Sequence, residues 1–394
     1  MTSQYETQNY DIIKIVDKAE IRYYPSVMTI KSNRKNGFVN LFGYISGKNG
    51  KNKKIAMTTP VTKPSNKMLE AMLSADVGDD VFKEDPTVND FEEKVASLFE
   101  KEAALFFPSG TMTNQTAIKL HTQPGDQLIC DHYSHIFNYE GGGVSFNSGV
   151  SCKMIKGNRG RITSSQILES INPPDFYHSP KTSLVCLENT TNKGGGAIYE
   201  LSEIEKISNL CKKHGLALHL DGARLWNALE VTKDKPSKYG ALFDTISLCF
   251  SKGLGCPVGS VLVGSNHHIN KALRIRKVFG GGMRQAGYLA AAGIFALNNN
   301  RDDLKKDHVK AKEIGETLEN CSFINSIEPI ETNIIIFSLK DFIDEELFIN
   351  RLKEKNILLI SLGKGKLRMV THRDYDENQH DYLLKTLSKI NFNA

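Results

Sequence analysis

Polar residues follow two of the apolar segments that the sequence predicts as strands. The run Leu216–Leu220 leads directly into Asp221, and the run Ile246–Phe250 is followed by Ser251 and Lys252. In an open α/β sheet, ligands bind at the carboxyl ends of the strands. A carboxylate and a primary amine are therefore expected at one edge of the sheet.

A small polar turn precedes the helix that we expect over Thr111–Leu120. The turn contains Ser109 and Gly110, and the free N–H groups and the dipole of the helix behind it favour a phosphate. Pyridoxal phosphate (PLP) needs a phosphate site, a carboxylate for its pyridine nitrogen and an amine for a Schiff base. Alone, Asp221 could cap a helix and Lys252 could be solvated, but their order and spacing together favour a PLP site.

From about residue 88 onward, apolar runs alternate with helical periodicity, which is typical of an α/β fold. The runs are short and continuously apolar, as in a parallel sheet covered by helices on both faces. We expect strands over Gln127–Asp131, Cys152–Ile155, Ser183–Leu187, Leu216–Leu220, Thr245–Phe250 and Ser260–Val263, and further helices over Ser164–Ser170 and Leu201–His214.

The two ends of the chain differ in composition from this central part. A helical stretch from Arg284 to about Leu318 leads to a predicted small α+β domain. Its expected elements are strand Asn333–Ser338, helix Asp344–Lys355, strands Leu358–Ser361 and Lys366–Val370, and a closing helix. Near the amino terminus we expect antiparallel strands over Tyr10–Val16, Glu20–Tyr24 and Val27–Lys31, and a helix over Phe38–Ile45.

Composition limits the classes of function. The 394 residues carry a net charge of +5, of which +6 lies in residues 1–57 and −1 in the rest, so a nucleic-acid partner is not expected. The longest apolar run, Leu289–Leu297, is too short for a membrane span, and the start lacks the pattern of a signal peptide. Seven widely spaced cysteines without a C-x-x-C pair favour neither a metal site nor a disulfide framework. These features predict a cytoplasmic protein.

Residues from about 61 to 394 resemble the threonine aldolase family of PLP enzymes. The resemblance rests on nine motifs in order: VTKPSNKMLEAM, VGDDVFKEDPTV, EAALFFPSGTMTNQ, SHIFNYEGGG, LENTTN, LHLDGARLWNA, FSKGLGCPVGSVLVG, RKVFGGGMRQAG and LRMVTH. It implies PLP fold type I, which is aspartate aminotransferase-like, with a mostly parallel central sheet. It also implies a homodimer or homotetramer with its sites at the subunit interface.

The resemblance implies roles for the cofactor-binding residues. Lys252 would hold PLP as a Schiff base, and Asp221 would pair with the pyridine nitrogen. Gly110 and Thr111 would bind the phosphate. Two further cations, Lys277 and Arg284, would reach it from a neighbouring subunit.

A second set of residues matches the family's catalytic and substrate-binding positions. His135 corresponds to a histidine that stacks on the cofactor, and His178 to one that faces the substrate hydroxyl; either could be the base, directly or through water. Arg224, beside the cofactor, and Arg368 correspond to the groups that bind the substrate carboxylate. Thr58 stands where a serine usually helps them.

The sequence departs from the family pattern in two places. Where RSDTVTKP is common, Met57 and Thr59 replace the Arg and the Asp, and Pro60 removes a backbone donor. Phe82 and Lys83 stand where Tyr and Gly are usual. These changes are expected to affect substrate affinity and turnover more than cofactor binding.

The expected reaction is cleavage of L-threonine or L-allo-threonine to glycine and acetaldehyde. Two alternatives stay open: a related PLP lyase, acting by β-elimination or on bulkier β-hydroxy amino acids, or an inactive fusion whose amino-terminal part is a haem-binding remnant. Residues 5–62 resemble the first third of the SOUL haem-binding family, and haem binding by such an incomplete fragment is not expected. The predicted domains are a β-rich fragment at 1–57, a large PLP-binding domain at 58–300 and a small domain at 301–394.

Overall fold

The computed structural model describes residues 11–16, 19–24, 27–32, 55–57 and 62–390. The chain divides into two compact units, Met1–Lys53 and Lys54–Ala394. In the first unit, three strands form an antiparallel sheet in chain order: β1 (Asp11–Val16), β2 (Ala19–Tyr24) and β3 (Val27–Ser32). The three antiparallel strands are therefore confirmed, whereas the predicted helix over residues 38–45 lies outside the described residues.

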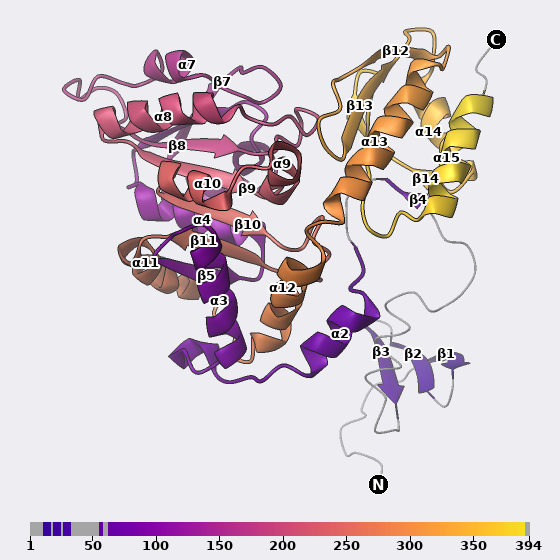
Figure 1. The fold of residues 1–394 in the computed structure, drawn as a ribbon, viewed down its shortest axis with the longest axis horizontal. Coiled ribbons are helices and arrows are strands. Elements are labelled where there is room, and N and C mark those ends of the chain that lie inside the picture. Colours follow the sequence, from indigo (N-terminus) through magenta and orange to yellow (C-terminus); the bar gives the residue numbers. More distant parts are fainter. Residues whose placement is uncertain (1–10, 17–18, 25–26, 33–54, 58–61, 391–394) are drawn as a thin grey trace. The chain divides into compact units, whose positions relative to one another are not determined.

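The second unit is built on a seven-stranded sheet with the order β5-β11-β10-β9-β8-β6-β7 (Figure 1). Strand β11 runs antiparallel to both of its neighbours, and the other neighbouring pairs are parallel, so the predicted α/β class with a mostly parallel sheet is confirmed. Strand β5 was not predicted. The bounds are β5 (Ala103–Phe107), β6 (Gln127–Asp131), β7 (Ser151–Ile155), β8 (Thr182–Glu188), β9 (Ala217–Gly222), β10 (Thr245–Cys249) and β11 (Ser260–Gly264).

Helices cover both faces of this sheet, as two separate sets of apolar contacts show. On one face pack α4 (Gly110–His121), α5 (His135–Asn138), α6 (Gly143–Ser148) and α11 (Asn266–Val278). On the other pack α2 (Asn66–Leu73), α3 (Pro86–Leu98), α7 (Ser164–Leu168), α8 (Leu201–His214), α9 (Leu225–Thr232), α10 (Pro236–Leu242) and α12 (Gly287–Asn299).

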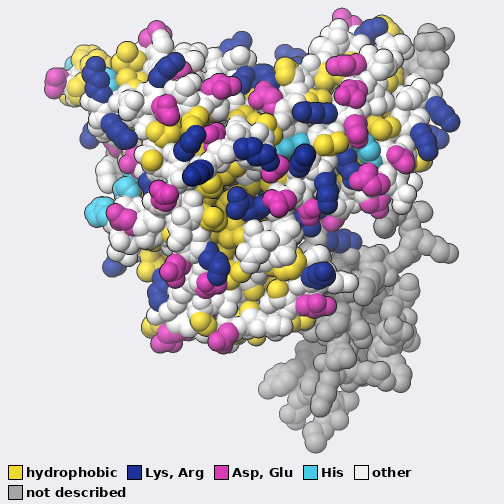
Figure 2. Space-filling view, viewed as in Figure 1, with side chains coloured by type: hydrophobic (Ala, Val, Ile, Leu, Met, Phe, Trp, Pro, Cys, Tyr) yellow, Lys and Arg dark blue, Asp and Glu magenta, His cyan; other side chains and the backbone are white. Residues whose placement is uncertain are grey.

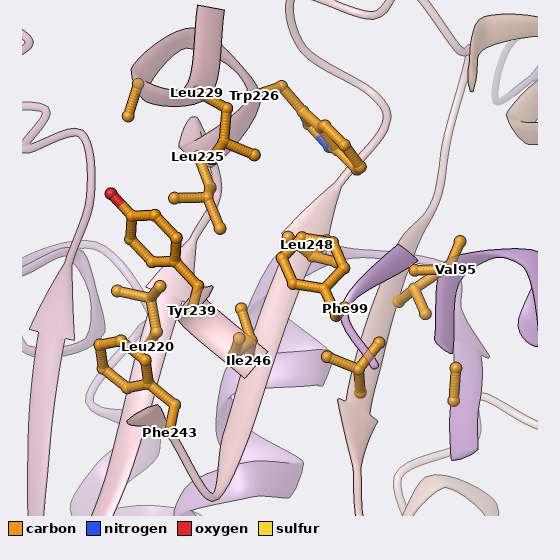
Figure 3. Close-up of a cluster of buried hydrophobic side chains, with 14 of the residues drawn as sticks. Val95, Phe99, Leu220, Leu225, Trp226, Leu229, Tyr239, Phe243, Ile246 and Leu248 are labelled. Carbon is orange, nitrogen blue, oxygen red and sulfur yellow. The ribbon is translucent and has the colours of Figure 1, made fainter. Parts of the chain in front are cut away.

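The central strands β9 and β10 present different side chains to the two faces. Leu220, Ile246 and Leu248 pack into the larger apolar cluster, beside Trp226 and Tyr239 (Figure 3). The residues between them point to the α4 face, because successive side chains of a strand point to opposite sides. The description of these strands as continuously apolar was therefore wrong: each alternates, but both of its sides are buried.

A smaller antiparallel sheet forms the carboxyl-terminal part, with the order β12-β13-β16-β15. The helical stretch predicted over residues 284–318 is two helices, α12 and α13, and the strand predicted over residues 358–361 is β14 followed by β15. Strand β12 was not predicted. The bounds are α13 (Leu304–Glu319), β12 (Ile324–Ile327), β13 (Ile334–Leu339), α14 (Glu345–Glu354), β14 (Ile357–Leu358), β15 (Ile360–Gly363), β16 (Lys366–Val370) and α15 (Glu377–Lys389).

The short strand before the first family motif belongs to this smaller part. Strand β4 (Ile55–Ala56) pairs in parallel with β14. Met57 continues it: its N–H donates to the Leu358 carbonyl at 2.8 Å, and its own carbonyl accepts from Val370 N–H at 3.0 Å. The Met57 side chain is fully buried in the apolar core of the smaller sheet. The departure at this position thus fills a core site, while the domain boundaries after residues 57 and 300 remain predictions.

The surface of the second unit carries mixed charge on the face that Figure 2 shows. Lys and Arg side chains there are interspersed with Asp and Glu. Over the described ranges, no helix is both long and apolar enough to cross a bilayer.

Candidate active site

Three neighbouring parallel strands bring functional groups to one edge of the large sheet. Glu188 is the last residue of β8, and the strand register pairs it with Asp221 of β9. The next strand, β10, ends at Cys249, and Lys252 follows in the loop. The predicted carboxylate and amine therefore lie at the carboxyl ends of adjacent strands, together with a second carboxylate.

The amino terminus of α4 lies against the end of β10. A Cβ atom built on Gly110 would come within 2.5 Å of Cys249 Sγ, so only glycine allows the helix to approach this closely. Ser109 caps the helix by accepting Met112 N–H at 3.2 Å. Thr111 and Gly110 occupy the first turn, where free N–H groups and the helix dipole stabilise an anion.

Asn114, one turn further along α4, links two buried carboxylates. Its Nδ2 lies 3.0 Å from Asp221 Oδ2 and 3.0 Å from Glu140 Oε1. The other oxygen of Asp221 accepts Ala223 N–H at 3.1 Å, and Gln115 donates to Glu140 at 2.6 Å. Both oxygens of Asp221 are thus held by neutral hydrogen-bond donors.

His135 begins α5 beside this pair. Its backbone N–H donates to Glu188 Oε2 at 2.7 Å, and its ring Nδ1 lies 3.0 Å from Glu140 Oε1. Burial lowers the pKa of His135, but the hydrogen bond to Glu140 and the nearby charge of Asp221 outweigh it, so the pKa is raised. One nitrogen or oxygen from each of His135, Glu140 and Asp221 lies within 4.8 Å of the other two.

Glu188 is almost completely buried, and burial together with the charge of Asp221 raises its pKa to about 7. Its Oε1 accepts Asn192 N–H at 2.7 Å. A group of this kind gains or loses a proton in the range where enzymes work.

Two guanidinium groups converge on the same region from different parts of the fold. Arg224 follows β9 and is buried, and its Nε has no hydrogen-bond partner among the described residues. Burial and the neighbouring charge of Arg368 lower the pKa of Arg224 to about 10. Arg368 comes from β16 of the smaller sheet, and its Nη1 donates to Asn192 Oδ1 at 2.8 Å. Two buried cations side by side are suited to a carboxylate, which accepts bidentate hydrogen bonds from arginine.

Three predicted residues are exposed, unlike the buried members of this cluster. His178 is exposed in the loop before β8, whose ends, Thr182 and Glu188, are about 20 Å apart. Lys277 and Arg284 are also exposed, and Arg284 is ion-paired with Asp79. Thr58 lies outside the described residues.

The departure at Phe82 and Lys83 has a local structural explanation. Lys83 has φ of +63°, a left-handed conformation that favours glycine, and its Nζ pairs with Glu92 Oε2 at 2.8 Å. The Phe82 side chain is 68% exposed and lies under Arg284, 5.9 Å from its guanidinium carbon to the ring centre.

Sequence reasoning assigned no role to Asn114, Glu140, Glu188 or Asn192. Glu188 could have been found by the rule that found Asp221, because it also ends a buried strand. Asn114 and Glu140 lie within two of the family motifs, EAALFFPSGTMTNQ and SHIFNYEGGG, and this membership was the signal that could have pointed to them. Only the packing of α4 against the strand ends brings them together.

The donor set fits PLP. The Nε of buried Arg224, which has no partner among the described residues, indicates an anionic ligand. The amino terminus of α4 offers a second anion site. Asp221 is placed to accept a hydrogen bond from a protonated ring nitrogen. Lys252 follows the end of the neighbouring strand, β10. A ligand with an aromatic nitrogen, a phosphate and an aldehyde satisfies all of these groups.

Several known proteins are similar to this chain in sequence or in fold. Residues 57–341 match the beta-eliminating lyase family. The chain is 39% identical over 330 residues to low-specificity L-threonine aldolase 1 of Arabidopsis thaliana, covering 82% of this chain and 92% of the relative. It is 37% identical over 320 residues to the low specificity L-threonine aldolase of Escherichia coli K12, covering 81% and 93%. The solved structure of Leishmania major threonine aldolase superposes with a TM-score of 0.74 at 22% identity, covering 85% of this chain and 99% of that one, and so supports the fold. The chain therefore belongs to the beta-eliminating lyase family, alongside the L-threonine aldolases.

Proposed function

We propose that the protein is a PLP-dependent aldolase that cleaves L-threonine or L-allo-threonine to glycine and acetaldehyde. The observation that carries the proposal is the edge of the large sheet where Asp221, His135 and the buried Arg224–Arg368 pair converge next to Lys252. The L-threonine aldolases of Arabidopsis and E. coli, at 39% and 37% identity, support the same reaction.

When bound, PLP withdraws electrons from the bonds at the substrate Cα. Asp221 would hold the proton of its pyridine nitrogen, and Lys252 would supply the amine that binds its aldehyde. Gly110 and Thr111 would donate their N–H groups to its phosphate.

The two arginines would orient the substrate. Arg224 and Arg368 present planar donors that bind a carboxylate in a fixed direction. A fixed carboxylate would fix the rotation about the bond between the amine nitrogen and Cα. This rotation decides which bond at Cα is cleaved, and the arginines would select the Cα–Cβ bond. The approach of Arg368 from the smaller sheet means that both parts of the second unit contribute to this step.

His135 is our candidate for the base that takes the proton of the substrate hydroxyl. Glu140 engages its Nδ1 at 3.0 Å, which leaves Nε2 as the acceptor, and the raised pKa favours taking up a proton. The transfer occurs directly or through water. His178 contributes only if another copy of the chain supplies it, since its own loop lies before β8.

We also propose that the site is shared between subunits of a homodimer or homotetramer. Lys277 and Arg284 are exposed cations at the end of α11 and in the following loop, next to exposed Val278 and Phe82. Mixing Lys252→Ala and Arg284→Ala proteins tests this, because a hybrid would contain one complete site. Activity that returns on mixing supports the shared site, and its absence in a mixture shown to contain hybrids contradicts it.

The reaction is tested with Lys252→Ala and a matched control, Lys206→Ala, an exposed lysine paired with Glu203. We expect Lys252→Ala to abolish release of glycine and acetaldehyde from threonine, and the control to retain it. Unchanged cleavage in Lys252→Ala would refute the proposal. Release of ammonia and an oxo acid instead of acetaldehyde would identify a β-eliminating lyase.

The resemblance of residues 5–62 to the SOUL family remains a proposal, and we expect this segment not to bind haem. Adding haem to the full-length protein and recording its absorption tests this. A sharp Soret band that saturates at one haem per chain would contradict the expectation.

A further inference from the structure

A row of polar side chains continues from the Asp221 site through the layer between α4 and the sheet. Asn114 Oδ1 accepts from Ser247 Oγ at 2.6 Å and faces His219 Nε2 at 3.2 Å. His219 Nδ1 lies 2.9 Å from Thr245 Oγ1, which in turn lies 2.9 Å from His121 Nε2. Asn114, His219, Thr245 and Ser247 are buried, so the neighbours that each one contacts decide its hydrogen bonds.

The carboxylates fix the orientation of the Asn114 amide. The oxygens of a carboxylate accept hydrogen bonds, and Asn114 Nδ2 faces two carboxylates, Asp221 and Glu140, both at 3.0 Å. The amide nitrogen must therefore point to them. Its oxygen then points to Ser247 and His219 and needs an N–H from the imidazole.

That requirement selects one tautomer of His219. Burial lowers the pKa of His219 to about 4, so the neutral ring carries a single proton, which must sit on Nε2. Nδ1 is then an acceptor, with two oxygens of Thr245 nearby, the hydroxyl at 2.9 Å and the carbonyl at 3.1 Å. Only the hydroxyl can donate. The carbonyl would favour the opposite tautomer, which would turn a lone pair of His219 toward Asn114 Oδ1.

His121 completes the chain of donors. Burial, together with the charge of His268, lowers its pKa to about 3, so it too is neutral. With the Thr245 hydroxyl donating to His219, His121 Nε2 donates to the lone pairs of that hydroxyl. The hydrogen bonds from His121 through Thr245 and His219 to Asn114 then all run in one direction of donation.

We propose that Thr245 is a positioning residue for the cofactor-binding carboxylate: its hydroxyl holds His219 as the Nε2–H tautomer, which keeps the Asn114 amide turned toward Asp221 and Glu140. The link to the cofactor rests on the function proposed above, whereas the tautomer does not.

Two substitutions separate the hydroxyl from the shape of Thr245. Thr245→Val keeps the shape and removes the donor, while Thr245→Ser keeps the donor and removes a methyl group. We expect Thr245→Val to bind PLP about tenfold more weakly than wild type, and Thr245→Ser to stay within about threefold. If Thr245 acted only by packing, the order of the two variants would be reversed, and that result, or unchanged binding in Thr245→Val, would overturn the proposal.

Thr182 offers a control on the opposite face of the sheet. Its hydroxyl is also buried, and it accepts from Asn172 N–H at 3.0 Å and Gln127 Nε2 at 3.1 Å, at the opposite end of β8. Thr182→Val should lower stability without changing PLP affinity. A loss of affinity equal to that of Thr245→Val would show that any buried hydroxyl matters and would overturn the specific role.

The tautomer is tested directly by neutron diffraction from crystals of the protein, with no substrate required. We expect a hydrogen on His219 Nε2 and none on Nδ1, with the Thr245 hydroxyl hydrogen directed at Nδ1. A hydrogen on Nδ1 would refute the proposal even if threonine cleavage is confirmed. Failure of the aldolase assignment alone would leave this measurement and the PLP titration unaffected.

Discussion

Alternate residues of strands β9 and β10 point to opposite faces of the sheet. Those on one face pack into the apolar core, and those on the other face support the candidate site. On one face, Leu220 and Leu248 pack into the large apolar cluster with Trp226 and Tyr239 (Figure 3). On the other, the residue after Leu220 is Asp221, held by Asn114 of α4. Both faces are buried, so burial alone does not mark the functional face. The difference is that the polar residues of these two strands on the α4 side each have a hydrogen-bond partner, as buried polar groups require; they are His219, Asp221, Thr245 and Ser247.

This comparison suggests a division of labour that substitutions can break. Changes on the apolar face should lower the free energy of unfolding and leave the chemistry of the folded molecules intact. Changes on the α4 face should affect cofactor binding and turnover more than stability.

Asp221→Asn should have the largest effect. It removes the charge that pairs with the pyridine nitrogen while keeping the shape of the side chain. We expect kcat/KM for threonine to fall about 1000-fold, equivalent to about 4 kcal/mol of transition-state stabilisation, with little change in the melting temperature. Steady-state kinetics and thermal unfolding check this. A drop in kcat/KM of less than tenfold would show that the ring nitrogen does not depend on this carboxylate.

Leu220→Ala, at the preceding residue, should lower the free energy of unfolding and leave turnover nearly unchanged. Leu220 is fully buried, and truncating it leaves a cavity that costs about 2–5 kcal/mol in the free energy of unfolding. The folded fraction should keep kcat within about twofold of wild type, since the residue faces away from α4. Urea unfolding and active-site titration measure the two quantities. A large loss of kcat with unchanged stability would refute the division between the faces.

Glu188→Gln should change how stability depends on pH. Burial, then the charge of Asp221, raises the pKa of Glu188 to about 7, so between about pH 4.5 and 7 the folded state binds a proton that the unfolded state has lost. Wild type should therefore lose stability relative to the variant as pH rises from 5 to 8, by on the order of 1–3 kcal/mol. Denaturant unfolding at each pH checks this. A difference that is constant with pH would show that Glu188 titrates normally.

The smallest effects are expected from a matched pair on β10. Ser247→Ala removes the donor to Asn114 Oδ1 and should weaken PLP binding a few-fold, at a cost of about 1 kcal/mol. Ile246→Val, on the opposite face, should cost about 0.5–1.5 kcal/mol of stability and leave PLP affinity unchanged. Fluorescence titration with PLP separates them. Equal PLP affinities in the two variants would show that the Ser247 hydroxyl does not contribute to PLP binding through Asn114.

Local sequence patterns predicted most of the central elements. Gln127–Asp131 and Leu201–His214 begin and end where we expected them, because apolar runs and helical periodicity reflect burial on one or both sides. Strand β5 was not predicted, although Ala103–Phe107 is also a short apolar run. The break between α12 and α13 was not predicted, although the polar run at residues 300–303 lies between the two helices.

The strand-end rule also found the key groups of the candidate site. It identified Asp221 and Lys252, and family motifs added His135, Arg224 and Arg368 as expectations. These residues come from segments up to about 230 positions apart in the chain, and the structure brings His135, Arg224 and Arg368 to the strand end that carries Asp221. His178 is exposed in the loop before β8. A motif match predicts a role for such a side chain but does not say which copy of the chain supplies it.

The sequence by itself determined which residue types could do chemistry and that they follow buried strands, because both are local properties of composition and order. The tertiary structure alone decided which of them meet and what surrounds them. Asn114 joins Asp221 to Glu140, and Met57 fills the core of the smaller sheet, through contacts between segments that share no local signal. Long-range packing also buries Glu188 and Arg224 next to other charges, and that burial sets their pKa values.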